Sequence, residues 1–219
     1  MGRRPRRGSP DQTRERLVAA AADVMNRVGY FGTDSNALAR AAGYAPAVFY
    51  RHFPDKRAIL LAAYARWVAT EWAEIGAILR ADAATADSRP RAARIAARLV
   101  PWIVAHHRRW YGLRASVLAL SVTDAVVRKA YLAQRRGQLD LLRDLRGQRP
   151  AANARETDAV LLFTFERTCD ALASGAAEPL GLRPARIEAL LVRLLTAYLA
   201  GDRSRRPRGS SARASVVSA

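Results

Sequence analysis

The sequence predicts an all-α protein of about nine helices. Apolar residues recur at helical spacing along most of the chain, and no segment shows the apolar–polar alternation with a period of two that marks a strand. Capping residues, glycines and prolines separate the apolar segments where helices should begin and end. Half of the 219 residues are hydrophobic, so the chain can bury a sizeable core.

The N-terminal part should contain three helices followed by a long fourth one. Ser9 starts a capping-box sequence with Pro10 at the first helical position, and Gly29 provides the stop. We expect Thr33 to cap the second helix and Asp55 to cap the fourth. These four helices should cover about residues 10–28, 33–42, 46–53 and 56–80.

Five further helices should follow a linker at residues 81–89, beginning near residues 90, 110, 123, 153 and 184. The last of them carries one wide apolar stripe opposite charged residues. The helix before it is apolar over a broader arc and must be covered on more than one side. Pro101 lies inside the fifth helical pattern, where it should remove a backbone hydrogen bond and kink the helix.

The formal net charge of +18 favours an anionic partner, most simply nucleic acid. Nearly half of this charge lies at the two ends of the chain. Residues 1–10 hold four arginines and no acidic residue, and residues 201–219 hold five arginines and one aspartate. Both ends are rich in Pro, Gly or Ser and are expected to be a disordered basic arm and a disordered basic tail.

Several classes of protein are excluded by residues that are missing. A single cysteine, Cys169, excludes a disulfide framework and a cysteine-based zinc site and is typical of a reducing cytoplasm. No apolar run approaches the roughly 20 residues that span a bilayer, and the arginines near the N-terminus precede no apolar export signal. His106 and His107 point about 100° apart on a helix, so they do not share a metal ion. With no catalytic motif, we expect no enzyme, no metal, no cofactor, a cytoplasmic location and no membrane partner.

Residues 33–53 hold two short helices joined by the turn Gly43-Tyr44-Ala45. This is the spacing of a helix-turn-helix, whose second helix enters the major groove of DNA. Gly43 allows the positive φ that such a turn requires. An ordinary pair of antiparallel helices has the same spacing, so spacing alone leaves both interpretations open. In both, five apolar residues form the shared core: Leu38, Ala39, Ala42, Phe49 and Phe53.

The residues themselves favour the helix-turn-helix. From Thr13 to about Arg66 the chain resembles the DNA-binding domain of the TetR family of bacterial transcriptional regulators. The resemblance is carried, in this order and spacing, by Ala19-Ala20-Ala21, Gly29-Tyr30, Thr33, Leu38-Ala39, Ala42-Gly43, Phe49-Tyr50-Arg51-His52-Phe53 and Lys56. It implies an all-helical homodimer of about nine helices, with a variable C-terminal domain that binds a small-molecule effector.

The resemblance also implies which residues contact DNA. Thr33 matches a helix N-cap that meets a phosphate, and Lys56 matches the lysine at the start of the fourth helix. Tyr50 and His52 match residues that contact the DNA backbone. The positions that approach base edges hold Ala45, Pro46, Ala47, Val48 and Arg51. Only Arg51 among these five can make a bidentate contact to guanine.

Two positions depart from the family pattern. Ala45 stands where the family commonly has serine, and Ala47 stands where it has glycine. Loss of the serine hydroxyl costs the third helix about 1 kcal/mol of capping energy and removes a group that faces a phosphate. Base recognition through Ala47 and Val48 would have to be apolar, for instance against thymine methyl groups.

In this family the fourth to seventh helices enclose the effector pocket. Aromatic and basic residues on the fourth to sixth helices are therefore candidate ligand-binding residues: Trp67, Arg98, Trp102, Trp110 and Arg114. Core aromatics and surface arginines explain each of them as well. The eighth and ninth helices have broad apolar surfaces and are expected to form the dimer as a four-helix bundle. The residues expected in that interface are Leu161, Phe165, Ile187, Leu191, Leu194 and Tyr198.

The expected organisation is a basic arm at residues 1–10, a DNA-binding domain at 11–71 with its helix-turn-helix at about 34–53, an effector-binding and dimerisation domain at 72–200, and a basic tail at 201–219. The expected function is that of a transcriptional repressor that binds a palindromic operator as a homodimer and is released by a small-molecule effector. Two alternatives remain. A nonspecific, nucleoid-type DNA-binding protein explains the arginine-rich ends, and a helical small-molecule-binding enzyme would need a reactive constellation.

Overall fold

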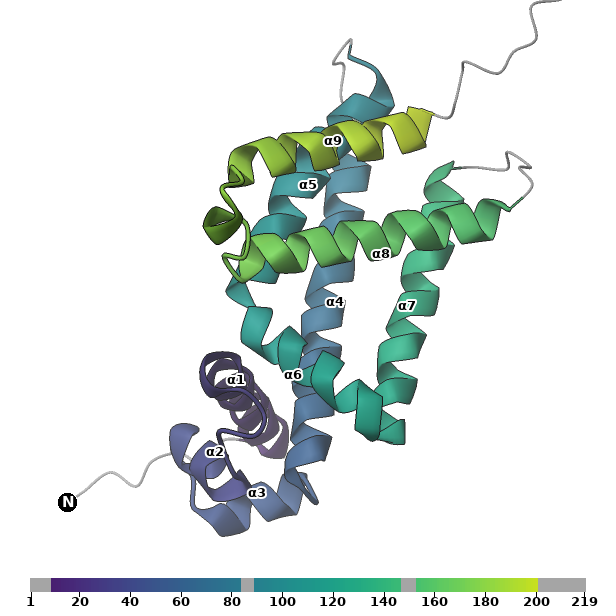
Figure 1. Ribbon diagram of the computed structural model, residues 1–219. Helices are drawn as coiled ribbons and strands as arrows, with labels where there is room; N and C mark the ends of the chain where they lie inside the picture. The colour runs from purple at the N-terminus through teal and green to yellow at the C-terminus, as the bar shows by residue number, and fades with distance from the viewer. Residues whose placement is uncertain (1–8, 84–88, 147–152, 201–219) are drawn as a thin grey trace, which may run out of the picture.

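The computed structural model describes residues 9–83, 89–146 and 153–200. Nearly all of the expected basic arm and the whole basic tail lie outside these ranges. Within them the chain forms nine α-helices, one 3₁₀ helix (η1, Glu178–Leu180) and no strand (Figure 1), which confirms the predicted fold class. The α-helices are α1 (Pro10–Val28), α2 (Ser35–Ala41), α3 (Pro46–His52), α4 (Lys56–Ala83), α5 (Arg91–Arg109), α6 (Tyr111–Thr123), α7 (Ala125–Arg146), α8 (Ala154–Ala173) and α9 (Pro184–Ala200).

The capping signals of α1 and α4 act as the sequence predicts. The Gln12 backbone N–H donates to the Ser9 hydroxyl at 3.3 Å, and the Ser9 backbone N–H donates to the Gln12 side chain at 3.2 Å. Gly29 ends α1 with a φ of 73°. The Asp55 carboxylate accepts a hydrogen bond from the Ala58 N–H at 2.7 Å and so caps the start of α4.

The start of α2 differs from the prediction, because its N-cap is Asp34 and not Thr33. The Asp34 carboxylate accepts a hydrogen bond from the Ala37 N–H at 2.7 Å, and this bond holds the pKa of Asp34 below its usual value. An aspartate caps at least as well as a threonine, and its charge also interacts favourably with the helix dipole. Thr33 therefore precedes the cap by one residue.

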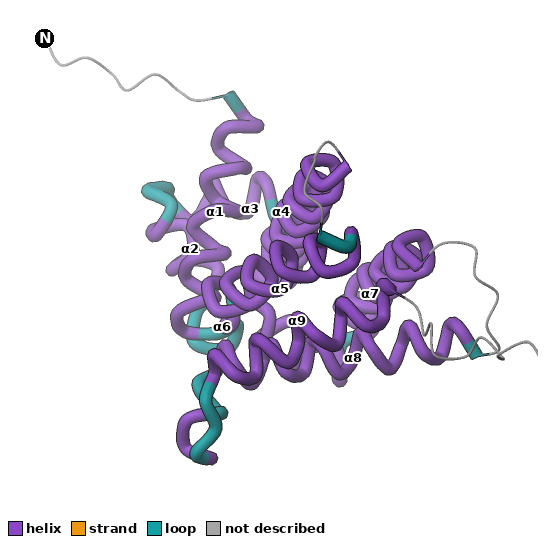
Figure 2. The backbone as a smooth tube through the Cα atoms, turned by 90° about the horizontal axis from the view of Figure 1, so that it is seen from above, coloured by secondary structure: helices purple, strands orange, loops and turns teal. Residues whose placement is uncertain are grey.

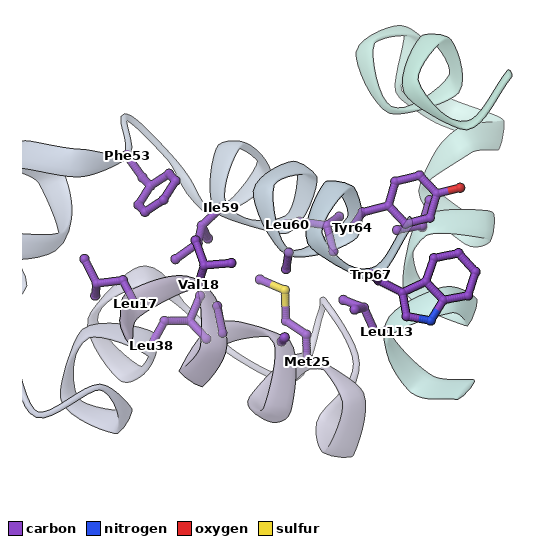
Figure 3. Close-up of a cluster of buried hydrophobic side chains, with 14 of the residues drawn as sticks. Leu17, Val18, Met25, Leu38, Phe53, Ile59, Leu60, Tyr64, Trp67 and Leu113 are labelled. Carbon is purple, nitrogen blue, oxygen red and sulfur yellow. The ribbon is translucent and has the colours of Figure 1, made fainter. Parts of the chain in front are cut away.

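Helix α4 connects the two hydrophobic clusters of the molecule (Figure 1). Ile59 and Leu60, near its start, pack in a cluster with α1, α2 and α3, whereas Ile75 lies in a second cluster with α5, α8 and α9. The first cluster also contains Leu113 from α6, which approaches Met25 of α1 (Figure 3). Helix α6 therefore completes the N-terminal core, and the expected domain boundary near residue 71 falls inside a continuous helix.

The C-terminal helices are arranged around the second half of α4. Helix α5 packs against α4, α8 and α9, and α7 packs against α6 and α8. Helices α8 and α9 cross the α4–α5 pair on the same side of the molecule in both views (Figures 1 and 2). One face of each of these two helices therefore points away from the rest of the chain.

A close backbone contact joins α1 to the start of α6. A Cβ atom on Gly112 would stand 2.0 Å from the backbone oxygen of Asn26, so this position accepts no side chain. The Asn26 side chain donates a hydrogen bond to the Arg109 carbonyl at 2.7 Å and accepts one from the Leu113 N–H at 3.1 Å. We call this contact the α1–α6 seam.

Two more polar contacts fix the same parts of the chain to each other. The Tyr30 N–H, just after α1, donates to the Ser116 hydroxyl of α6 at 3.0 Å. Arg57 at the start of α4 forms an ion pair with Asp124 in the turn between α6 and α7 at 3.1 Å. The N-terminal helices are thus held to α6 by directional bonds as well as by apolar packing.

We predict that Gly112→Ala lowers the free energy of unfolding by about 1–3 kcal/mol, the range typical of overpacking. The added methyl group would overlap the Asn26 carbonyl, so the backbone of α1 or α6 would have to move. Denaturant unfolding followed by circular dichroism measures the change.

Gly76→Ala is the matched control for this substitution. Gly76 lies inside α4, where the nearest atom to an added Cβ is the guanidinium nitrogen of the flexible Arg80 side chain, at 3.1 Å. Replacing a glycine inside a helix by alanine stabilises by roughly 0.5–1 kcal/mol. If both substitutions stabilised the protein, the α1–α6 seam would not be the close contact described here.

Candidate DNA-binding surface and internal cavities

Helix α3 presents its predicted contact residues on an outward face. The fully buried Phe49 fixes its orientation, and the Tyr50 ring stands edge-on to the Phe49 ring at a centroid distance of 5.3 Å. Of the six predicted contact residues on α3, three are exposed and three are half-buried: Ala47, Tyr50 and Arg51, then Pro46, Val48 and His52. Tyr50 is 54% exposed. No described residue of the chain pairs with the Arg51 guanidinium, so α3 carries an aromatic group and a cation that face solvent.

The turn and the start of α3 have the geometry that their residues predict. Gly43 has a φ of 79°, and no atom lies within 4 Å of the position its Cβ would take. Ala45 is the N-cap residue of α3 and makes no side-chain hydrogen bond, while Pro46 occupies the first helical position. The helix therefore starts on the fixed φ of the proline without a capping side chain.

Lys56 makes its main contacts within the chain. Its ammonium group donates to the backbone carbonyls of Tyr30 at 2.8 Å and Thr33 at 2.7 Å, and it lies 4.1 Å from the centroid of the Tyr30 ring. Burial lowers the pKa of Lys56, and the nearby Asp34 offsets part of this shift. An ammonium group has three N–H donors, so one remains for a phosphate. Lys56 thus holds the turn between α1 and α2 against α4.

Eight buried polar side chains from five helices meet in the C-terminal part of the molecule, and each is at most 8% exposed. We call them the buried polar cluster: Glu71 of α4, His107 of α5, Arg114 of α6, Gln134, Arg135 and Gln138 of α7, and Glu166 and Asp170 of α8. Arg114 forms a two-pronged ion pair with Asp170, at 2.7 and 3.1 Å. Arg135 forms an ion pair with Glu166, and the His107 ring nitrogen Nδ1 lies 3.3 Å from Asp170.

Glu71 differs from the other two carboxylates of the cluster, because no described cation is in ion-pair contact with it. Its two oxygens accept hydrogen bonds from the side-chain amides of Gln134 and Gln138, at 3.1 and 3.2 Å. Burial raises the pKa of Glu71, while the charge of Arg135 opposes this shift. Burial also lowers the pKa of His107, so its ring is neutral at pH 7.

An apolar cavity of about 80 Å³ lies beside this cluster, and we call it the inner cavity. It is lined by α4, α5, α7, α8 and α9. Four of the lining residues are polar and belong to the buried polar cluster: Glu71, His107, Gln138 and Glu166. All the others are isoleucine, leucine or phenylalanine. The inner cavity therefore has an apolar wall and one polar end.

A larger hollow of about 650 Å³, the outer cleft, lies between α1 and helices α4, α5 and α6. The rings of Trp67, His106 and Trp102 stack along it with centroid distances of 5.1 and 4.7 Å. Burial lowers the pKa of His106 to about 4, so this imidazole is neutral at pH 7. The outer cleft is walled by aromatic rings, and the charged side chains of Arg66 and Glu74 also line it.

The five predicted ligand-binding residues do not share one site. Trp67, Trp102 and Trp110 line the outer cleft. Arg98 is exposed on α5 and lines neither hollow. Arg114 is buried in an ion pair with Asp170 and is not available as the cation for an anionic ligand.

Glu71 is not among the residues predicted from the sequence, although a signal was present. Trp67, Glu71 and Ile75 follow each other at intervals of four residues, so Glu71 lies on the buried stripe of α4. A charged residue on such a stripe requires buried partners, because an unpaired buried charge is strongly unfavourable. Those partners come from α7, more than 60 residues away in the sequence.

The predicted dimer residues lie on different sides of α8 and α9. Leu161, Phe165 and Leu191 are buried in the chain's own core, which corrects the expectation that they face a partner. Ile187 and Tyr198 are half-buried against the same core, and only Leu194 is well exposed, at 41%. The large apolar side chains that these two helices do expose are Val160, Phe163, Leu190 and Leu194.

Three remaining points concern the single cysteine, metal ligands and membrane-spanning helices. Cys169 is buried in the second hydrophobic cluster, and burial raises the pKa of its thiol to about 12. Over the described ranges, no group of three or more His, Cys, Asp or Glu side chains is placed to hold a metal ion. No helix in those ranges is both long enough and apolar enough to cross a membrane.

Comparison with known proteins agrees with the resemblance seen in the sequence. Residues 17–63 match the model of the bacterial regulatory proteins of the tetR family. No curated protein sequence matches the chain significantly. A transcriptional regulator from Rhodococcus sp. Rha1 has 21% identity and a TM-score of 0.68, over 89% of this chain and 97% of that one.

Two further solved structures have the same fold. A protein described as a TetR-family transcriptional regulator from Mesorhizobium loti has 16% identity and a TM-score of 0.66, over 89% of this chain and 98% of that one. A regulator from Saccharomonospora viridis, solved in complex with choline, has 20% identity and a TM-score of 0.62, over 84% of this chain and 96% of that one. The resemblance to the TetR family is thereby confirmed for the N-terminal helices and for the fold.

We predict that Arg114→Met lowers the free energy of unfolding by about 3–5 kcal/mol at pH 7, because it leaves Asp170 buried without its main cationic partner. The ion pair and the His107 hydrogen bond lower the pKa of Asp170 in the folded state, although burial alone would raise it. The stabilisation from Asp170 is therefore present above the unfolded pKa of about 3.9 and is lost as the pH falls through the lower folded pKa.

The difference between wild type and Arg114→Met should accordingly shrink below about pH 4. Denaturant titrations at several pH values measure it. The exposed Arg98, changed to Met, is the control and should alter the free energy of unfolding by no more than about 0.5 kcal/mol. A loss of similar size in both variants would argue against the ion pair as its cause.

Proposed function

We propose that the protein is a transcriptional repressor, because residues 17–63 match the model of the tetR-family bacterial regulatory proteins and the chain has the fold of a TetR-family transcriptional regulator. It binds a palindromic operator as a homodimer and is released by a small-molecule effector. The observation that carries the proposal is the outward face of α3, where Tyr50 and Arg51 are exposed beside the buried Phe49. Its place of action is the cytoplasm, which the single cysteine also favours.

In this proposal α3 enters the major groove. Arg51 reaches a base edge or a phosphate with its unpaired guanidinium, and Tyr50 contacts the DNA backbone together with His52. Ala47 and Val48 offer only apolar contact. The third N–H of Lys56 supplements these contacts. The Thr33 hydroxyl oxygen is buried and has no hydrogen-bond partner among the described residues, so a phosphate contact from Thr33 requires a shift of the turn between α1 and α2.

The homodimer forms through the outward faces of α8 and α9. The four large apolar side chains exposed there come from two helices on the same side of the molecule (Figure 2). Pairing such a face with its own copy about a two-fold axis buries both at once. The same symmetry sets two α3 helices about 34–36 Å apart, one helical turn of DNA, and so requires a palindromic operator.

The effector acts by favouring an arrangement of the dimer in which the two α3 helices are not one helical turn of DNA apart. A ligand shifts such an equilibrium only through its different affinities for the two arrangements. The α1–α6 seam and the continuous helix α4 are the two connections through which a ligand between the C-terminal helices reaches α3. The Saccharomonospora viridis regulator of the same fold was solved with choline bound, which supports a small molecule as the effector here.

We predict that Arg51→Ala weakens operator binding by about 1–3 kcal/mol, roughly 5- to 150-fold, with a comparable loss for Tyr50→Ala. Both substitutions truncate exposed side chains, so fold and oligomeric state should not change. The operator is first selected from random DNA with the wild-type protein, and affinities are then measured by gel shift.

Arg98→Ala is the matched control for charge, because it removes one exposed arginine from α5 and should leave affinity nearly unchanged. Wild-type affinity in Arg51→Ala and Tyr50→Ala would show that α3 is not the reading helix. Selection that yields no palindrome, with uniform coating in a footprint, would favour the nucleoid-type alternative.

We predict that Leu194→Arg converts the dimer to a monomer while the chain stays folded, because the side chain is exposed in the protomer and buried in the proposed interface. Light scattering measures the mass, and circular dichroism verifies the helix content. Leu191→Arg should instead unfold the protein, because Leu191 is only 4% exposed and packs in the protomer core.

Leu118→Arg is the control for this substitution. The exposed fraction of Leu118, 37%, is similar to the 41% of Leu194, but Leu118 lies on α6. The arginine variant at this position should remain dimeric. A Leu194→Arg protein that is still a dimer would rule out the α8–α9 face.

A further inference from the structure

We propose that the inner cavity binds a small hydrophobic amine, with its ammonium group on Glu71 and Gln138 and its hydrocarbon part against the leucine and isoleucine walls. The idea that this amine is the effector rests on the proposed function. The binding itself does not, because it follows from the charge, the donors and the shape of the cavity.

The charge of the buried polar cluster favours a cation. Two guanidinium groups, Arg114 and Arg135, are paired with Asp170 and Glu166. Glu71 is the third carboxylate and has only neutral amide partners, while His107 is neutral at pH 7. Burial opposes the ionisation of Glu71, and the charge of Arg135 favours it. With all three carboxylates ionised, the cluster holds one negative charge in excess, and a cation bound at Glu71 favours this ionised form. A bound cation removes this excess, whereas an anionic ligand adds to it.

The hydrogen-bonding groups at the polar end of the cavity also favour a donor. The side-chain oxygen of Gln138 is buried and has no hydrogen-bond partner among the described residues, although Gln138 itself is 8% exposed and lines the cavity. Each Glu71 oxygen has one amide donor, and a carboxylate can accept about four hydrogen bonds. An ammonium group brings three N–H donors and no acceptor, and hydrogen bonds to charged groups are the strong ones.

The size and the walls of the cavity limit the rest of the ligand. One water occupies about 10–15 Å³ on this measure, so 80 Å³ accommodates roughly five to eight non-hydrogen atoms. Apart from the four polar residues at one end (Glu71, His107, Gln138 and Glu166), the lining residues are all isoleucine, leucine or phenylalanine, so the rest of the ligand meets only apolar side chains. The ligand class is thus a primary amine on a compact hydrocarbon body of about four to seven carbons, such as cyclohexylamine.

The position of the site connects it to the DNA-binding helices. The buried polar cluster includes Arg114 of α6, which follows Gly112 of the α1–α6 seam by two residues. Glu71 lies on α4, which carries residues of both hydrophobic clusters. An ammonium group on Glu71 therefore adds a positive charge to the cluster that joins α4 and α6, two helices against which α1 packs.

The test compares cyclohexylamine, which is protonated at pH 7, with cyclohexanol, a neutral molecule of nearly the same shape. Isothermal titration calorimetry with the full chain and no DNA measures both affinities. We expect the amine to bind at least tenfold more tightly than the alcohol. Glu71→Gln keeps the shape of the side chain but removes its charge, and it should reduce this preference to less than threefold.

Glu74→Gln is the matched control, because it makes the same change of charge on α4 at an exposed residue outside the inner cavity. This variant should keep the full preference for the amine. The wild-type ratio of amine to alcohol affinity needs no variant, so it decides the proposal even if Glu71→Gln does not fold.

Equal affinity for the two probes, binding of neither probe, or an undiminished preference in Glu71→Gln would each overturn the proposal. A gel shift with the selected operator, with and without cyclohexylamine, is a separate measurement. Release of the operator would identify the amine class as the effector, and amine binding without release would reject that role alone. A wild-type protein that binds cyclohexylamine but no operator would contradict the proposed function and leave the amine site standing.

Discussion

The position of the N-terminal helices depends above all on the contact between the backbones of α1 and α6. At Gly112 the two backbones approach so closely that only a glycine fits. The Asn26 side chain donates to the carbonyl of Arg109 at the end of α5 and accepts from the N–H of Leu113 in α6. This approach brings Leu113 into the core of α1 to α4. Without α6 that core would lack one of its walls, so α1 to α3 and the C-terminal helices do not form fully independent units.

The buried polar cluster gives the C-terminal helices a defined arrangement. Ion pairs taken out of water seldom stabilise a fold more than apolar residues would, and they become strongly unfavourable when one partner is missing. Here Asp170 and Glu166 on α8 each need an arginine, and the two arginines come from α6 and α7. A placement of these three helices that separated either arginine from its carboxylate would leave a buried charge without its partner. The cluster therefore acts on the geometry more than on the total stability.

The features that the sequence predicted correctly are those set by local chemistry. Ser9, Gly29 and Gly43 define a cap, a stop and a turn through their own backbone or side-chain preferences, and the structure has all three. The error at the start of α2 has a local cause as well. Thr33 and Asp34 are neighbouring residues that both cap helices well. In the structure the Asp34 carboxylate caps α2, and the Thr33 carbonyl accepts a hydrogen bond from Lys56 instead.

The features that the sequence could not predict depend on which side of a helix meets the rest of the chain. Helix α9 is apolar over an arc wide enough to include both Leu191 and Leu194, and only the packing of α5 shows that Leu191 points inward. The outward face of α3 was easier to predict, because Phe49 and Tyr50 differ in polarity and lie on different sides of the helix, one buried and one exposed. The hydrogen-bond partners of Glu71 could not be predicted from the sequence, since nothing local to α4 indicates that the amides come from α7.

The energies involved indicate how small a ligand is sufficient for regulation. Lowering the affinity for the operator 100-fold requires a difference of about 2.7 kcal/mol between the binding free energies of the effector for two arrangements of the protein. A hydrogen bond to a charged group contributes about 1.5–3 kcal/mol, and a cation near a buried carboxylate is screened less than one at the surface. One ammonium group that reaches Glu71 in one arrangement and not in the other therefore supplies a difference of the required size. The apolar wall of the inner cavity needs only to hold the amine in place.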